Sequence, residues 1–208
     1  IVQDEQLEQN TQTIVKNGKV RKQPNVTTIP NPLALNFYVL GFDYRKNLIA
    51  LTDTVKQNLR VYLSQYRVLT DAINIKDAYT INIAVRFSII TQRGYNKNEV
   101  LIKCIDAIKN HFDVDKWSIA QPIILSDIAY VISLVDGVAS VVPPEDDNPQ
   151  KQMVVIENKY KVEDGYSGHV YDLQSATKDG VIYSSLDPSI FELKFPNIDI
   201  EGRVVGDI

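Results

Sequence analysis

The 208-residue chain contains few of the residues that carry most protein chemistry. It has one cysteine, Cys104, and two histidines, His111 and His169. A single cysteine excludes an internal disulfide and any metal cluster built from several cysteines. No apolar run approaches the roughly 20 residues that a helix needs to cross a bilayer. We therefore expect no disulfide, no metal site, no cofactor and no membrane partner.

An excess of charge of one sign is also missing. The 22 basic and 26 acidic side chains leave a formal net charge of -4. The basic residues are scattered along the chain, and the short basic segment 16–22 contains no aromatic residue on which a base would stack. The sequence therefore predicts no nucleic-acid partner.

The common catalytic motifs are absent as well. The sequence contains no G-x-S-x-G, no P-loop and no G-x-G-x-x-G. Cys104 lies on the apolar side of a predicted helix, where a free cysteine behaves as a small hydrophobic residue. His111 follows that helix, whose C-terminal end favours a partly charged imidazole, and His169 stands alone. We predict no catalytic residue, no small-molecule substrate and no enzyme, although dispersed carboxylates can still meet in three dimensions.

Two acidic groups have a spacing that is found in cation sites. Asp113 and Asp115 form a D-x-D, but the glycine and the further oxygen ligands of a calcium loop are missing. We expect these two residues to serve in a turn or as a helix cap. The acidic residues 145–147 lie between prolines and predict a solvated loop tip.

The N-terminal residues 1–32 are polar and contain Pro24, Pro30 and Pro32. Proline disfavours both helix and regular sheet, so this segment is predicted to be an extended connector. The first residues resemble neither a signal peptide nor a start at methionine. We therefore expect the chain to be the later part of a longer polypeptide, with an N-terminal region missing.

Residues 33–142 are predicted to fold as an α+β domain. β-branched and aromatic residues predict a strand over 35–43. Apolar residues at three- and four-residue spacing then predict a helix over 48–66, with Asn47 as its N-cap. The expected order is strand–helix–strand–strand–helix–helix–strand, with the helices on one face of a mainly antiparallel sheet.

Two further helices are indicated by their end signals. Asn96 with Glu99 resembles a capping box at the start of the second helix. Ser126 is expected to cap the third helix and Gly137 to end it, before a strand over 138–142.

The clearest strand pattern covers residues 81–89, where five apolar residues alternate with polar or small ones. A period of two predicts a strand with one buried face and one wet face. Asn82, Arg86 and Ser88 are then expected to face solvent or a neighbouring subunit. A hairpin through residues 76–79 is expected to join this strand to the preceding one.

Residues 143–208 show strand-like segments and no helical period. They are predicted to form either a β-rich extension of the same sheet or a second small domain. Four of the 11 tyrosines fall here: Tyr160, Tyr166, Tyr171 and Tyr183. Tyrosine is favoured at protein interfaces and also simply in strands, so both interpretations stay open.

A long ordered run of residues resembles a known family. The segments that carry the resemblance are "YRVLTDAINIKDAY" (66–79), "NEV" (98–100), "CIDAIKNHFDVDKW" (104–117), "QPI" (121–123) and "SLDPSIFELKFPNIDIEGRVV" (185–205). Together they make residues 48–208 similar to the C-terminal part of the baseplate wedge proteins of T4-like contractile-tailed phages, in the baseplate J-like family. Residues 1–32 match no family in this way.

The resemblance implies a structural protein of the virion, located in the tail baseplate and assembled in the host cytoplasm. Members of the family dimerise, join neighbouring wedges into a ring and contact other wedge proteins, and they offer no catalytic residue to carry over. A homodimer within a ring is therefore expected. The alternative, from the residues alone, is an intracellular ligand-binding or regulatory α+β domain with a β-rich interaction module.

Overall fold

The computed structural model describes residues 2–3, 11–16, 19–24, 34–66, 72–144, 151–185 and 188–207. The chain forms two compact units. Unit 1 consists of Ile1–Gly41 and Ala50–Asp77, and unit 2 of Phe42–Ile49 and Ala78–Ile208. These boundaries lie elsewhere than the predicted ones at 32/33 and 142/143. The predicted loop tip at 145–147 lies outside the described residues.

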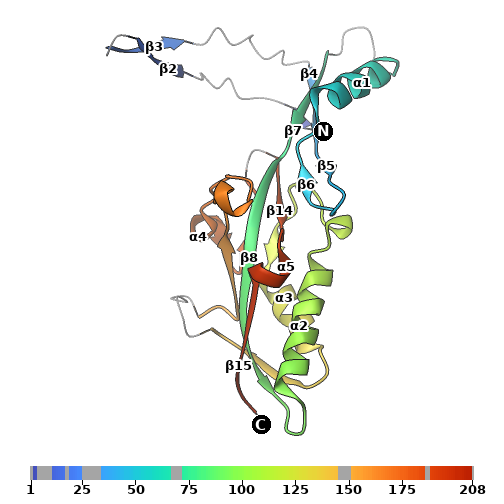
Figure 1. The fold of residues 1–208 in the computed structure, drawn as a ribbon, viewed down its shortest axis with the longest axis vertical. Coiled ribbons are helices and arrows are strands. Elements are labelled where there is room, and N and C mark those ends of the chain that lie inside the picture. The colour runs from blue at the N-terminus through green and yellow to red at the C-terminus, as the bar shows by residue number, and fades with distance from the viewer. Residues whose placement is uncertain are drawn as a thin grey trace. The chain divides into compact units, whose positions relative to one another are not determined.

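Unit 1 contains one helix and five strands among its described residues (Figure 1). Strand β4 is the middle of a three-stranded sheet, antiparallel to β1 and parallel to β7. A separate antiparallel pair is formed by β2 and β3. The bounds are β1 Val2–Gln3, β2 Thr11–Lys16, β3 Lys19–Pro24, β4 Ala34–Val39, β7 Ala72–Asp77 and α1 Asp53–Ser64. The two-residue strands β5 Gly41–Phe42 and β6 Leu48–Ile49 pair with each other in a further small sheet.

The β2–β3 pair differs from the irregular connector predicted for residues 1–32. Its register runs from Lys16 opposite Lys19 to Thr11 opposite Pro24. The dipeptide Asn17-Gly18 between the strands is a strong sequence signal for a two-residue hairpin connection. Proline is tolerated at the end of a strand, which is where Pro24 stands.

Helix α1 begins later than predicted. Its N-cap is Thr52 and not Asn47, and the side chain of Thr52 makes no capping hydrogen bond. Leu48 and Ile49 form strand β6 instead of a first helical turn. The backbone N–H of Leu48 donates to the buried carboxylate of Glu192, a tertiary contact that no local pattern shows.

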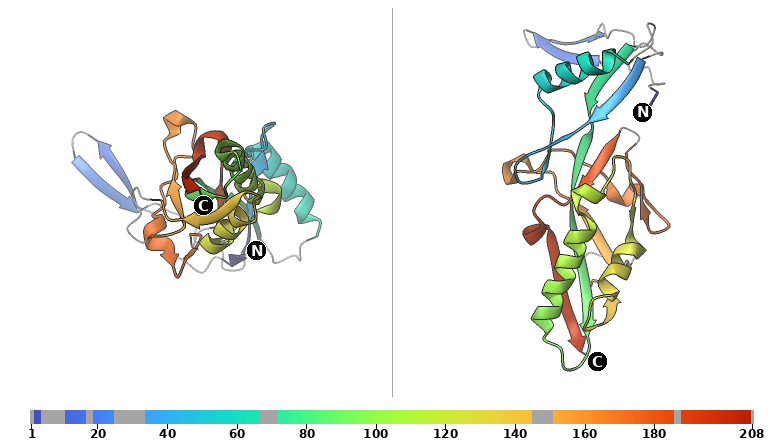
Figure 2. Two further views of the ribbon diagram at one scale, coloured as in Figure 1. Left: turned by 90° about the horizontal axis from the view of Figure 1, so that it is seen from below. Right: turned by 90° about the vertical axis from the view of Figure 1, so that its right-hand side faces the viewer.

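Unit 2 is organised around the 13-residue strand β8, Tyr79–Thr91 (Figures 1 and 2). Two strands pair with it antiparallel and two parallel, so the sheet is mixed and not mainly antiparallel. The antiparallel neighbours are β10 Val138–Val142 and β11 Val154–Asn158, and the parallel ones are β14 Ser189–Glu192 and β15 Ile200–Asp207. The α+β fold class is confirmed.

The remaining elements of unit 2 are mostly short. A second small sheet has the order β12–β13–β9. The helices are α2 Lys97–His111, α3 Leu125–Ser133, α4 Leu173–Ala176 and α5 Pro196–Asp199, the 3-10 turns are Val114–Lys116 and Val162–Asp164, and the strands of the small sheet are β9 Ile123–Ile124, β12 Thr177–Lys178 and β13 Val181–Ile182. Residues 143–208 therefore contain two short helices that the sequence pattern missed. Three strands of this segment pair with β8, as expected of a sheet extension.

The predicted hairpin through residues 76–79 is wrong. Only Ala78 separates β7 from β8, and the two strands pair with different neighbours. Alternation alone indicates that each segment is a strand, but not which strand it pairs with.

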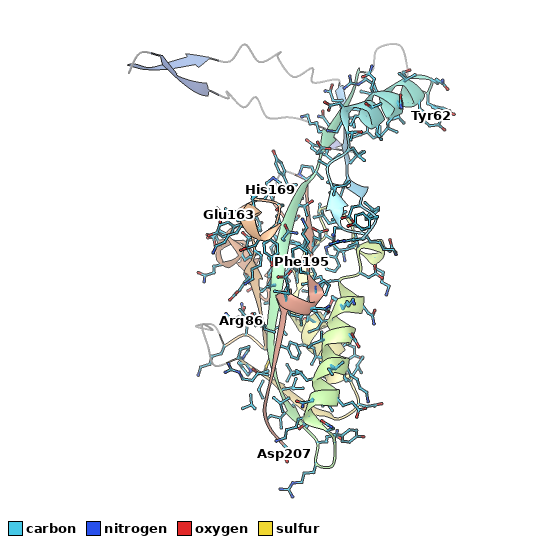
Figure 3. The ribbon with its side chains drawn as sticks, in the orientation of Figure 1. Tyr62, Arg86, Glu163, His169, Phe195 and Asp207 are labelled. Atoms are coloured by element: carbon cyan, nitrogen blue, oxygen red, sulfur yellow. The ribbon has the colours of Figure 1, made fainter. Side chains whose placement is uncertain are left out.

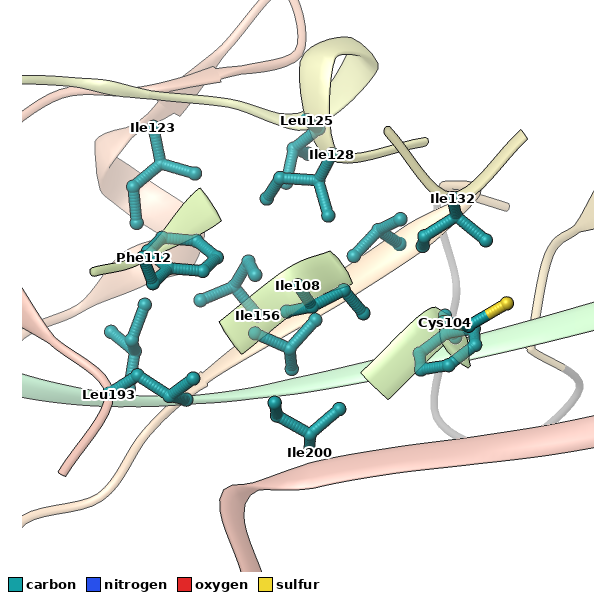
Figure 4. Close-up of a cluster of buried hydrophobic side chains, with 14 of the residues drawn as sticks. Cys104, Ile108, Phe112, Ile123, Leu125, Ile128, Ile132, Ile156, Leu193 and Ile200 are labelled. Carbon is teal, nitrogen blue, oxygen red and sulfur yellow. The ribbon is translucent and has the colours of Figure 1, made fainter. Parts of the chain in front are cut away.

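The core of unit 2 lies between β8 and the helices α2 and α3 (Figure 4). The odd-numbered residues of β8 from Ile81 to Ile89 belong to it, and Ile83, Val85 and Ile89 are completely buried. Val100, Cys104 and Ile108 of α2 and Leu125, Ile128 and Ile132 of α3 face them. Burying large aliphatic side chains at this density contributes roughly 1.5–3 kcal/mol each.

The helix ends were predicted with mixed success. Asn96 is the N-cap of α2, as predicted, and its side chain accepts from the N–H of Asn98. Glu99 forms an ion pair with Lys103, at 2.7 Å, rather than completing a capping box. Ser126 lies inside α3, whose N-cap is Ile124, so that predicted cap is wrong. Gly137, at φ 93°, lies a few residues beyond the end of α3.

The close contact between α2 and β15 depends on Gly202. A Cβ added at Gly202 would lie 2.5 Å from both the Leu101 Cδ1 atom and the Phe87 Cζ atom. The Phe87 ring is 1% exposed and has no room to turn away. We predict that Gly202→Ala destabilises unit 2 by about 1–3 kcal/mol through overpacking.

The measurement is urea unfolding followed by circular dichroism. Gly206→Ala on the same strand is the matched control, because nothing lies within 4 Å of a Cβ added there. Equal midpoints for the two variants would contradict the overpacking argument.

Candidate functional site

A buried polar network crosses β8 in unit 2. The Glu192 side chain on β14 is 2% exposed, and it accepts from the Leu48 N–H at 2.5 Å and from the Asn82 side-chain amide at 2.7 Å. Asn82 is fully buried, and its side-chain oxygen accepts from the Ser167 N–H at 2.7 Å. Glu192 and Asn82 therefore tie the 42–49 turn, two strands and the loop around Ser167 together.

This network corrects the predicted wet face of β8. Asn82 and Ser88 are buried, at 0% and 3% exposure, and Arg86 is half-buried and forms an ion pair with Glu157. The physical reason is that residues from distant segments, among them Ser167 and Glu192, bond to Asn82 on this face of β8. Alternation of apolar and polar residues does not distinguish a wet face from a buried polar one.

Burial raises the pKa of the Glu192 carboxyl above its ordinary value. The hydrogen bonds from Leu48 and Asn82 and the charge of Lys194 act in the opposite direction, and the charge of Asp43 adds to the increase. Glu192 forms no salt bridge with a described residue. A buried carboxylate held by two neutral donors carries a desolvation cost that its hydrogen bonds only partly offset.

The 42–49 turn, which Glu192 holds through the Leu48 N–H, also has hydrogen bonds of its own. The carboxylate of Asp43 accepts from the backbone N–H groups of Arg45 and Asn47, at 2.7 and 2.8 Å. These hydrogen bonds lower the pKa of Asp43 despite the opposing effect of desolvation. The turn carries the exposed ring of Tyr44, against which the guanidinium of Arg45 stacks at 5.1 Å from the ring centroid.

The residues weighed from the sequence as reactive groups do not come together. Cys104 is fully buried in the core, and desolvation raises its thiol pKa to about 11. The His111 ring packs edge-on against Phe112 and Trp117. Burial lowers the pKa of His111, which is opposite to the partly charged imidazole predicted for a helix end. His169 Nδ1 lies 3.0 Å from the Thr80 carbonyl oxygen, beside β8 (Figure 3).

Asp113 and Asp115 have the local roles that the sequence predicted. Asp113 caps a 3-10 turn by accepting from the Asp115 N–H. Asp115 forms an exposed ion pair with Lys46 at 2.7 Å. Within the described part of the chain, no group of three or more histidine, cysteine, aspartate or glutamate residues is placed to hold a metal ion.

The four tyrosines of the C-terminal segment divide into two kinds. The Tyr166 hydroxyl donates to the buried Asp199 carboxylate at 2.6 Å, and the Tyr171 hydroxyl donates to the Tyr183 carbonyl at 2.7 Å. Those two side chains therefore serve the fold. Tyr160 and Tyr183 are exposed.

One surface with exposed apolar side chains lies along α1 and just beyond its end, in unit 1. The helix buries none of its residues completely. Lys56 pairs with Asp77 of β7, and Leu59 and Leu63 are half-buried on the side that packs against this strand. The neighbouring side exposes Val55 at 46%, Tyr62 at 56% and Tyr66 at 72%. We call these three residues the α1 flank.

Val55 and Tyr62 lie on one side of α1 because their spacing of seven residues is close to two helical turns, and Tyr66 follows two residues after the last helical residue, Ser64. The rings of Tyr62 and Tyr66 contact each other, with centroids 5.3 Å apart. Figure 3 shows Tyr62 projecting from the surface of α1. Tyrosine and valine at this exposure give an apolar strip with polar tips, the composition that protein interfaces favour.

No protein-family model matches the sequence, and a search of curated proteins finds no match. None of the helices in the described ranges is both long enough and apolar enough to cross a membrane.

The raised pKa of Glu192 predicts that the stability of the fold depends on pH. A carboxyl group whose pKa is raised by folding binds its proton more tightly in the folded than in the unfolded state. Its contribution to the free energy of unfolding is therefore largest at low pH and is lost as pH rises from the unfolded value of about 4.5 through the folded pKa. Relative to Glu192→Gln, the unchanged protein is predicted to gain stability as pH is lowered from 7 to 5.

Urea unfolding of the unchanged protein and of Glu192→Gln at a series of pH values measures the difference between their free energies of unfolding. The other titrating groups are the same in both proteins, so their effects largely cancel in this difference. A difference that stays constant, or that shrinks on acidification, would show that the hydrogen bonds from Leu48 and Asn82 outweigh burial.

Proposed function

We propose that this chain is a structural component of a contractile phage tail baseplate, in which it joins wedges into a ring. It does so through dimerisation and through contacts with other wedge proteins, and it resides in the virion after assembly in the host cytoplasm. The long resemblance over residues 48–208 supports this proposal. No reaction, cofactor or small-molecule substrate is part of it.

The observation that carries the proposal is the exposed α1 flank. A helix that packs one side on its own sheet and leaves Val55, Tyr62 and Tyr66 in water gains stability when another surface covers them. At roughly 25 cal/mol per Å² of apolar area, covering three such side chains favours association by a few kcal/mol before the entropy of docking is subtracted. Exposed apolar strips of this kind mark protein contacts more often than they serve the isolated fold.

The turn 42–49 in unit 2 supports the same interpretation. Phe42, Tyr44 and Ile49 are exposed, at 55%, 86% and 45%. The backbone of the turn is fixed by Asp43 and by the bond from Leu48 to Glu192. Exposed apolar side chains on a rigid support lose little entropy on binding, which is the property of a contact point in an assembly.

We predict that the chain is present in purified tails of the phage that encodes it. Quantitative mass spectrometry should find its peptides in a constant ratio to other tail proteins across a density gradient, because an assembled subunit has a fixed copy number. A protein that the same phage makes for DNA replication serves as the control and should be lost on purification.

The result that would end the proposal is a chain recovered only from the soluble fraction of infected cells. If such a chain also became more stable on addition of a cellular metabolite, the ligand-binding alternative would replace the assembly role.

A further inference from the structure

Two exposed segments of unit 2 are joined by the buried network on β8. One is the 42–49 turn, whose exposed apolar side chains are Phe42, Tyr44 and Ile49. The other is the loop of residues 159–171, in which Figure 3 labels Glu163 and His169. The large apolar side chains that this loop exposes are Tyr160, Val162 and Val170, at 45%, 69% and 73%. Both ends of the network therefore belong to segments that present apolar side chains to water.

Three hydrogen bonds run in series between the turn and the loop. The Leu48 N–H donates to Oε1 of Glu192 at 2.5 Å, and Nδ2 of Asn82 donates to Oε2 of the same carboxylate at 2.7 Å. Oδ1 of Asn82 accepts from the Ser167 N–H, also at 2.7 Å. We call these four residues and their three bonds the polar series. Glu192 is 2% exposed and Asn82 is fully buried, so bulk water has little access to either side chain.

The direction of each bond in the polar series is fixed by the backbone groups at its two ends. A backbone N–H only donates, an ionised carboxylate only accepts, and a side-chain amide offers one donor group and one acceptor atom. Asn82 therefore has a single orientation that satisfies both of its neighbours. Turning its amide over would set its NH₂ group against the Ser167 N–H and its oxygen against the carboxylate of Glu192. Because a buried polar group that loses its partner bears its full desolvation cost, the three bonds favour one another.

We propose that Glu192 and Asn82 couple the 42–49 turn to the 159–171 loop, so that loosening one segment loosens the other. If the turn withdraws the Leu48 N–H, the carboxylate of Glu192 loses one of its two donors and shifts. Asn82 then loses the contact that fixes its orientation toward Ser167. Hydrogen bonds within one buried network support each other in this way. The coupling must also act from the loop toward the turn, because a coupling free energy is reciprocal.

The loop also has attachments that bypass the polar series. His169 Nδ1 lies 3.0 Å from the Thr80 carbonyl oxygen. The Lys159 N–H donates to the backbone oxygen of Asn82 at 2.9 Å, so this bond does not pass through the Asn82 side chain. These bonds hold the loop on β8 when the series is broken. The expected effect is therefore a graded change in how often each segment opens, and not the loss of either segment.

This inference goes beyond the proposed function and does not depend on it. Any molecule that covers the exposed side chains of the turn would restrain the turn, and through the polar series it would also restrain the loop. A second molecule that binds the loop would then meet a segment that is already ordered, which makes the two binding events cooperative without a movement of β8.

Amide hydrogen exchange in the full chain, followed by NMR, tests the coupling. Asp43→Ala removes two hydrogen bonds from backbone N–H groups within the turn and changes no member of the polar series. It is expected to speed exchange at Ser167 by about threefold or more, as for residues that share one hydrogen-bond network. Exchange at Lys159 in the same loop should change much less, because its bond bypasses the series. In the opposite direction, His169→Ala should speed exchange at Leu48.

Glu192→Gln breaks the polar series while it keeps the shape of the side chain. One carboxylate oxygen becomes an NH₂ group, which cannot accept from the Leu48 N–H or from the Asn82 amide, whichever of the two it faces. In this background Asp43→Ala should no longer change the exchange rate of Ser167. This loss of coupling is a result that independent structural roles of the same residues would not produce.

Gly202→Ala is the matched control for general destabilisation, because its added Cβ meets Leu101 and Phe87, neither of which belongs to the polar series. It should not speed exchange at Ser167 more than at Lys159. Circular dichroism spectra that match the unchanged protein show that each variant is folded, and Asp43→Asn, which keeps the shape of the side chain, replaces Asp43→Ala if the latter does not fold.

Three results would overturn the inference. The first is a Ser167 exchange rate that stays constant in the Asp43 variant. The second is equal acceleration at Ser167 with and without Glu192→Gln, which would assign the coupling to another path. The third is selective acceleration at Ser167 in Gly202→Ala, which would show that any destabilisation of unit 2 opens the loop. All of these measurements use the isolated chain, so their outcome is separate from whether the chain is found in purified tails.

Discussion

Strand β8 is hydrogen-bonded along both edges and covered on both faces over most of its length, and the other elements of unit 2 take their places from it. Its two antiparallel neighbours and its two parallel neighbours come from segments far apart in the chain. One face carries the row from Ile81 to Ile89 that packs against α2 and α3. Residues 78–208 belong to one unit in which four of the seven strands after β8 return to it.

The second face of β8 carries the buried polar network. Asn82 lies fully buried at the point where Glu192 of β14 and the backbone of Ser167 meet. Each of these hydrogen bonds joins segments separated by more than 80 residues. A buried carboxylate contributes little net stability, but it specifies which backbone groups must stand beside it. The 42–49 turn is fixed in this way, through the N–H of Leu48.

The residues weighed from the sequence as reactive groups have structural roles in the fold. Cys104 and His111 are used for packing, and Asp113 and Asp115 for a turn and an ion pair. The exposed apolar side chains include the α1 flank and the aromatic side chains of the 42–49 turn, as well as others such as Tyr130 and Leu134 of α3. Tyr44, Tyr62 and Tyr66 are exposed on ordered backbone, and the proposed association with another protein would cover them.

Local patterns in the sequence were enough to predict the elements whose signal lies within one segment. The alternation from Ile81 to Ile89 indicated a strand, Asn96 marked the start of α2, and residues 138–142 form a strand as their β-branched residues predicted. The α+β class followed from the change between the two periodicities. These features depend on side chains within one or two turns of each other, so a single segment contains all the information.

Local patterns could not predict the features that depend on contacts between segments far apart in the sequence. The hairpin expected after Asp77 is absent because β7 pairs with β4, and the face expected to be wet is buried because Glu192 and Ser167 cover Asn82. Helix α1 starts at Asp53 and not at Leu48, whose N–H is bonded to a carboxylate 144 residues away. The α1 flank was visible in the sequence only as part of an apolar stripe. Which members of that stripe stay exposed was set by how much of the helix β7 can cover.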